Sequence, residues 1–85
     1  MKYEVKILEA FLAGNNGGFV KLAIYNQLSD EFDTQEWVNN GDGWFVDFFH
    51  GPLGLYEILG EDDELTDETL WNFIDSGAKE ITIEA

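Results

Sequence analysis

Charged and apolar residues alternate over residues 2–7, Lys-Tyr-Glu-Val-Lys-Ile, at the start of the chain. A period of two is typical of a strand with one buried face, so we expect a first strand over about residues 3–12. Residues 14–18, Gly-Asn-Asn-Gly-Gly, are of types that tolerate a positive φ, and a second β-rich run occupies residues 19–25. The pattern therefore predicts an N-terminal β-hairpin.

The next segment carries signals for a helix. Ser29 is of a type that caps helix N-termini, and three of the four residues 30–33 are acids, which the helix dipole favours in a first turn. Asn39-Asn40-Gly41 is typical of a helix C-terminus. We therefore expect a helix over residues 30–39, although its apolar residues do not gather on one face.

Residues 44–49, Trp-Phe-Val-Asp-Phe-Phe, are apolar on both faces except for one aspartate. Such a run is typical of a central strand that is covered on one side by helices. Gly51-Pro52 ends it. A short helix over residues 53–59 is expected from its helical spacing of apolar residues.

After an acidic stretch, Thr66 can cap a helix that carries Leu70, Phe73 and Ile74 on one face and ends at Ser76-Gly77. Residues 78–84 alternate and predict a last strand. The expected fold is a single α+β domain over residues 1–85, with a mostly antiparallel sheet and the order ββαβααβ.

Composition narrows the possible functions. The chain has a net charge of -14, with 45% hydrophobic residues, so it is acidic and yet able to form a core. Residues 1–29 hold two acids and three lysines, a net of +1, whereas residues 30–85 hold sixteen acids and one lysine, a net of -15. Direct binding to nucleic acid or to an anionic membrane is disfavoured without a basic patch.

The location and chemistry of the protein follow from what its sequence contains. The opening residues do not resemble a signal peptide and no apolar run approaches the length of a membrane span, so a cytoplasmic protein is expected. The chain has no cysteine, and its one histidine, His50, has no nucleophile at a recognisable spacing. The acidic stretches lack the pattern of a calcium loop. We expect no enzymatic activity, no cofactor and no metal site.

Six carboxylates crowd residues 61–68, Glu-Asp-Asp-Glu-Leu-Thr-Asp-Glu, with no Lys or Arg between Lys21 and Lys79. On helices, residues three or four apart are neighbours, so acids at this spacing form continuous anionic surfaces. A tryptophan that lies among such acids, Trp71 or Trp44, is of a type that anchors protein interfaces. The candidate partner-binding residues are Asp30, Asp33, Glu36, Glu57, Glu61, Asp62, Asp63, Glu64, Asp67, Glu68 and Trp71.

Carboxylates at helical spacing lie about as far apart as the phosphates of a nucleic-acid strand. The first hypothesis is therefore a DNA- or RNA-mimicking inhibitor that blocks a basic nucleic-acid-binding protein or complex. A second is an acidic module of another kind, such as an immunity protein, an enzyme inhibitor or an adaptor, steered by charge and anchored by aromatics. A third is a salt-adapted domain whose acids only keep it hydrated. A monomer or a homodimer suits each hypothesis.

The strand, the Asn15-Asn16-Gly17 turn, the second strand, the acidic segments and the later Val46-Asp47-Phe48 strand resemble the first domain of ArdA-type antirestriction proteins. The chain also resembles small acidic anti-defence proteins of phages, including anti-CRISPRs. It departs from ArdA in residues 22–24, Leu-Ala-Ile, where that family tends to carry a tryptophan. The resemblance implies that acids on helices mimic phosphates and that the protein acts in the host cell cytoplasm.

Overall fold

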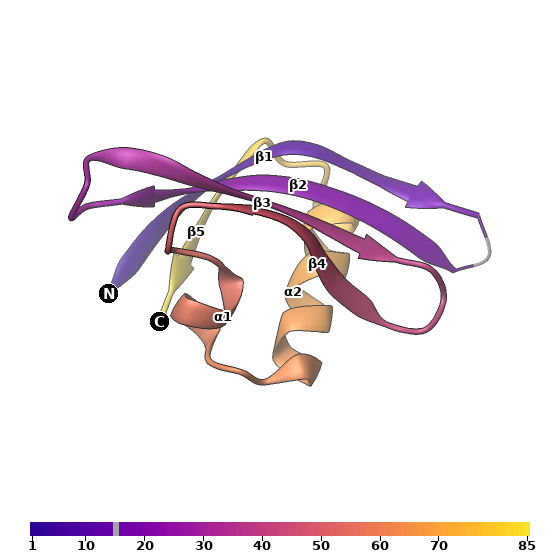
Figure 1. The fold of residues 1–85 in the computed structure, drawn as a ribbon. Helices are drawn as coiled ribbons and strands as arrows, with labels where there is room; N and C mark the ends of the chain where they lie inside the picture. Colours follow the sequence, from indigo (N-terminus) through magenta and orange to yellow (C-terminus); the bar gives the residue numbers. More distant parts are fainter. Residues whose placement is uncertain (15) are drawn as a thin grey trace.

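The computed structural model describes residues 1–14 and 16–85, and among these the chain forms five strands and two helices. The strands form one antiparallel sheet in the order β4-β3-β2-β1-β5, and both helices lie on one face of it (Figure 1). The expected Asn15-Asn16-Gly17 turn includes Asn15, which lies outside the described residues. The elements are β1 (Lys2–Ala13), β2 (Gly17–Asn26), β3 (Glu31–Asn39), β4 (Trp44–His50), α1 (Leu55–Leu59), α2 (Asp63–Ser76) and β5 (Glu80–Glu84).

The first two strands form a long hairpin whose register contains one irregularity. Ile7 pairs with Leu22 and Glu9 pairs with Lys21, so Leu8 is an extra residue in β1. This is the arrangement of a β-bulge, which bends a strand and increases its twist. β5 pairs with β1 only over Lys2–Lys6, immediately before the bulge. The second half of β1 therefore runs along the sheet without β5 beside it.

The expected helix over residues 30–39 is wrong, because this segment is strand β3, paired along its length with β2. A tight turn precedes it, in which the Asp30 N–H donates to the Asn26 carbonyl at 2.9 Å and Asp30 adopts a left-handed φ of 57°. Ser29 lies in this turn and caps no helix. Every second residue of β3 is buried, but three of these four residues are polar: Asp33, Gln35 and Asn39. The apolar residues of the segment therefore do not show the period of two that is typical of a strand.

The expectation of a central strand over residues 44–49 is also wrong. β4 is an edge strand, paired only with β3, and all its residues except Trp44 are exposed. Its pairing shifts between Val46 and Phe48, which leaves Asp47 as an extra residue at the edge. The expected α+β fold with the order ββαβααβ is therefore wrong. The element order is ββββααβ, and the described part of the chain is mainly sheet.

The core lies between the sheet and the two helices, where strand residues facing the helices meet one face of each helix. α2 begins at Asp63 and is capped by the side chain of Asp62, not by Thr66, which is buried within the helix. It ends at Gly77 in the left-handed conformation (φ 63°) that suits glycine at a helix C-terminus. The fully or nearly buried apolar residues are Val5, Ile7, Val20, Leu22, Ile24, Trp37, Trp44, Leu55, Ile58, Leu70 and Phe73.

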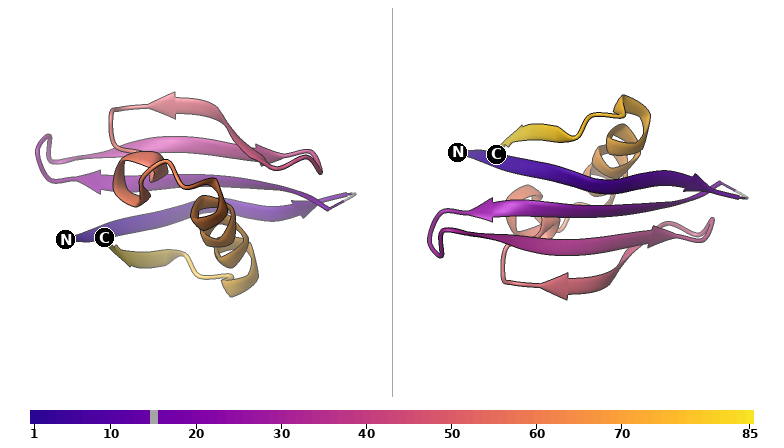
Figure 2. Two further views of the ribbon diagram at one scale, coloured as in Figure 1. Left: turned by 90° about the horizontal axis from the view of Figure 1, so that it is seen from below. Right: turned by 90° about the horizontal axis from the view of Figure 1, so that it is seen from above.

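The two faces of the molecule differ in charge. The helical layer, residues 51–76, contains eight acids and no Lys or Arg. On the opposite face of the sheet, which neither of the two described helices covers (Figure 2), Lys6 alternates with the inward-facing Val5 and Ile7, and its ammonium lies 4.5 Å from the centroid of the Phe32 ring. Within the described residues, no helix is long and apolar enough to cross a membrane.

Candidate protein-binding surface

Part of the acidic run over residues 61–68 stabilises the start of α2. The Asp62 carboxylate accepts a hydrogen bond from the Leu65 N–H at 3.1 Å, which caps the helix. Asp63 lies in the first turn, where the helix dipole favours an anion, and accepts a hydrogen bond from the Tyr56 hydroxyl at 3.1 Å. These two acids therefore have structural roles as well as charge.

Three more of the candidate acids are also engaged within the molecule. The Glu57 carboxylate accepts from the Gly54 N–H at 3.0 Å and so closes the start of α1. Asp33 is buried and accepts from the Asn26 side-chain amide and the Leu53 N–H, both at 3.0 Å. Asp30 accepts from the Tyr25 hydroxyl in the β2–β3 turn. Asp33 therefore lies in the protein interior, where a partner cannot reach it.

The helical spacing expected among Asp30, Asp33 and Glu36 does not exist, because this segment is a strand. In a strand, residues separated by three positions point to opposite faces. Asp33 faces the helices, whereas Glu36 lies on the uncovered face between Lys21 of β2 and Phe48 of β4. These three acids do not form one anionic surface.

One row of acids lies on the side of α2 that faces away from the sheet. Within the described residues, these acids make no hydrogen bond. Glu64, Glu68 and Asp75 are exposed and are spaced by four and seven residues, which places them on one helix face. We call these three residues the α2 acidic row. Asp75 was not among the candidates from the sequence, although its seven-residue spacing from Glu68 was the available signal. Glu61 is also exposed, in the short connection before the helix.

Asp75 lies in the last turn of α2, where the helix dipole disfavours an anion and no basic residue offsets it. Asp67 is also in an unfavourable position: burial raises its pKa above the ordinary value of 3.8, and the nearby Asp63 carboxylate raises it further. The helix thus keeps negative charge at two places where it opposes stability.

The expected tryptophan anchors belong to the interior packing. Trp44 is buried and the half-buried Trp71 packs edge-on against it, with ring centroids 5.1 Å apart. The exposed aromatic residues among those described are instead phenylalanines of the sheet: Phe11 (51% exposed), Phe45 (46%), Phe48 (41%) and Phe49 (48%). Cross-strand pairing places Phe11, Phe19, Val38 and Phe45 in one row across the uncovered face.

Among residues 1–14 and 16–85, no group of three or more acidic or histidine side chains could hold a metal ion. His50 is exposed at the end of β4, where it pairs with Thr34. Comparison of the chain with known protein families, with curated proteins and with solved structures found no match. The resemblance to ArdA-type and other anti-defence proteins therefore stays a prediction.

Proposed function

We propose that this protein is an acidic inhibitor that occupies the nucleic-acid groove of a basic DNA- or RNA-binding protein, of the restriction or CRISPR type, in the cytoplasm of the host cell. The observation that carries the proposal is the α2 acidic row on a helical layer that has eight acids and no base. The choice of a defence protein as target rests on the resemblance to anti-defence proteins. The protein itself binds no nucleic acid, because its charge repels phosphate.

The spacing of the α2 acidic row suits a groove that binds phosphates. An α-helix rises about 1.5 Å per residue, so Glu64 and Glu68 lie about 6 Å apart along the axis, and Glu68 and Asp75 lie about 10.5 Å apart. One DNA strand carries a charge every 3.4 Å or so of axis, so these separations approximate two and three phosphate steps. A cluster of Lys or Arg that contacts alternate phosphates can therefore contact these carboxylates in turn.

The rest of the charge assists the approach of such a partner. A net charge of -14 creates a long-range field that attracts a basic protein and accelerates association at low ionic strength. The same field is screened beyond a Debye length of about 10 Å at 0.1 M salt. Binding that depends on the α2 acidic row should therefore weaken steeply as salt rises.

The experiment is affinity capture from bacterial lysate at low salt, with three forms of the protein. The test variant carries Glu64→Gln, Glu68→Gln and Asp75→Asn, which neutralises the α2 acidic row. Its stability should stay close to that of the wild type, because the loss of a favourable first-turn acid is offset by the loss of an unfavourable last-turn acid. Thermal melts verify this.

The matched control carries Glu31→Gln, Asp42→Asn and Asp47→Asn, three exposed acids away from the helices. Both variants have a net charge of -11, so they differ only in where the charge was removed. We expect the control to retain nucleic-acid-binding proteins and the test variant to lose them. Equal retention by the two variants would show that only total charge matters and would refute the α2 acidic row as the site.

A second candidate function is an acidic protein-binding module anchored by aromatic side chains, and the exposed phenylalanines of the sheet favour it. Exposed aromatics are enriched where interfaces bury apolar contacts. In that case Phe45→Ser with Phe48→Ser, at the edge strand, would abolish capture, whereas neutralising the α2 acidic row would not. The salt dependence would also be shallow, because apolar contacts are not screened.

A further inference from the structure

The outer edge of β1 is open over half its length. β5 pairs with Lys2–Lys6, and beyond it the last backbone hydrogen bond on this side joins the Ile7 N–H to the Lys79 carbonyl at 2.8 Å. Within the described part of the chain, no strand pairs with residues 8–13 on the side away from β2. An open strand edge presents backbone donors and acceptors that a further strand can use.

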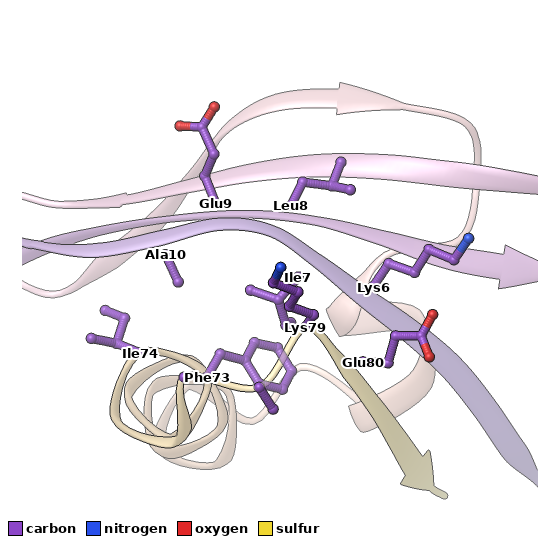
Figure 3. Close-up of a pocket in the computed structure, with 11 residues that line it drawn as sticks. Lys6, Ile7, Leu8, Glu9, Ala10, Phe73, Ile74, Lys79 and Glu80 are labelled. Atoms are coloured by element: carbon purple, nitrogen blue, oxygen red, sulfur yellow. The ribbon is translucent and has the colours of Figure 1, made fainter.

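A cleft of about 780 Å³ lies beside this open edge, between β1 and the end of α2. Figure 3 shows Ala10 of β1 directed toward Phe73 and Ile74 of α2, so the floor of the cleft is apolar. Leu8 and Glu9 rise from the other face of the strand in the same view. A strand laid along this edge would therefore have Ala10, Phe73 and Ile74 beneath it and the Glu9 carboxylate above it. The charged residues Lys6, Lys79 and Glu80 also line the cleft.

The last turns of α2 extend beyond β1 on the side of β5 (Figure 2). These turns, which include Phe73 and Ile74, lie beneath the position that an added strand would occupy, and we call them the shelf. A second copy of the chain brings its own α2 beneath its own β1, so a symmetric pairing of two β1 edges would bring a second helix end to the same face of the joined sheet. The shelf favours a single extended segment with no helix beneath it.

We propose that the open edge of β1 binds an extended peptide segment of a partner protein by strand addition, over Leu8–Ala13. These six residues span about 20 Å at the rise of an antiparallel strand. Side chains toward the helix meet Ala10, Leu12 and the shelf, so they should be apolar. The intervening side chains lie near Glu9 on a protein of charge -14, so Lys or Arg fits there. This site is distinct from the α2 acidic row and does not depend on it.

The experiment is a titration of the isotope-labelled protein with a blocked seven-residue peptide that alternates valine and lysine, followed by amide NMR. We expect shifts confined to residues 8–13 and to 77–79, where the cleft lies. The same peptide N-methylated at its five central residues has no amide donors there and should cause none of these shifts. A peptide that alternates valine and glutamate should bind at least about tenfold more weakly, because the charge is reversed.

A matched pair of leucine substitutions tests the site. Leu12→Lys places a cation on the open edge, where lysine obstructs strand addition, whereas Leu28→Lys makes the same change in the β2–β3 turn. Leu12 is 67% exposed and Leu28 fully exposed, so both variants should fold, as circular dichroism verifies. We expect the dissociation constant for the valine-lysine peptide to rise about tenfold in the first and to stay within about twofold in the second.

Three outcomes would overturn the proposal. One is a peptide response centred on β4, the other edge of the sheet; another is equal binding of the N-methylated peptide. The third is a concentration-dependent shift of residues 8–13 without peptide, which would show that a second copy occupies the edge. If Leu12→Lys fails to fold, Leu8→Lys, on the other face of the same edge, replaces it.

Discussion

Gln35 joins β3 to the start of α1, and its replacement tests this part of the fold. It is 2% exposed, and its side-chain oxygen accepts two hydrogen bonds, from the Trp37 indole N–H at 3.1 Å and from the Leu55 N–H at 2.8 Å. The second donor is one of the free N–H groups of a helix first turn. The substitution Gln35→Met keeps the length of the side chain and removes the acceptor.

The expected loss follows from the two donors that Gln35→Met leaves buried. An unsatisfied buried donor costs about 1–3 kcal/mol, so with two donors the free energy of unfolding should fall by about 2–6 kcal/mol. A chain of this size has a total stability of roughly 4–13 kcal/mol. The variant should therefore be strongly destabilised and, at the lower end of that range, unfolded.

Urea denaturation followed by circular dichroism measures the change. The matched control is Gln27→Met, the same substitution at an exposed position in the β2–β3 turn, which should alter stability by no more than about 0.5 kcal/mol. If Gln35→Met were also within about 0.5 kcal/mol of the wild type, the side chain would not be buried between the strand and α1. The placement of residues 31–39 as an inner strand would then be refuted.

Three further predictions concern the same layer. Asp67→Asn should raise the melting temperature at pH 7, because the raised pKa of Asp67 means that its charge opposes folding; this gain should disappear as pH falls below 3.8, where the carboxyl becomes protonated in both the folded and the unfolded state. Gly54→Ala should lower the melting temperature, since an added Cβ would lie 2.0 Å from the Gln35 amide nitrogen. Burial and the Asp63 hydrogen bond raise the pKa of Tyr56. Its contribution to the stability of the fold is therefore fully present below pH 10 and is lost as pH rises through its folded pKa. In a pH series of thermal melts, the melting temperature of Tyr56→Phe should fall less at alkaline pH than that of the wild type.

The sequence allows some elements to be located and hides others for physical reasons. The N-terminal alternation is visible because the residues that face the helices, Val5 and Ile7, are apolar and their neighbours are charged. In β3 the buried side of the strand carries Asp33, Gln35 and Asn39, so the usual signal is absent. Asp33 and Gln35 accept hydrogen bonds from the Leu53 and Leu55 N–H groups, about twenty positions later, which no local pattern can show.

The edge position of β4 could not be read from its composition. Its run of large apolar residues is typical of a covered strand, yet the chain turns back beneath the sheet at Gly51, and among the described residues no later strand pairs outside β4. Gly51 is required there, since an added Cβ would meet the Asp33 carboxylate at 2.2 Å. The sequence alone does not show that all three phenylalanines of this strand are exposed.

The candidate acids divide according to their surroundings. Counting charges along the chain identifies the acidic run, but it cannot separate Asp62, which caps a helix, from Glu68, which has no partner within the described residues. It also cannot show that Asp33 is buried. Only the three-dimensional arrangement indicates which carboxylates are available to a partner, and it adds Asp75 to them.

The most direct test of the proposed function is whether a captured protein can hold this protein and DNA at the same time. The captured protein is purified, bound to a labelled duplex and titrated with the wild type and with the variant that lacks the α2 acidic row. We predict that the wild type displaces the duplex, with no ternary complex in a mobility-shift assay, and that the variant does not. A stable ternary complex with the wild type would contradict occupation of the nucleic-acid groove.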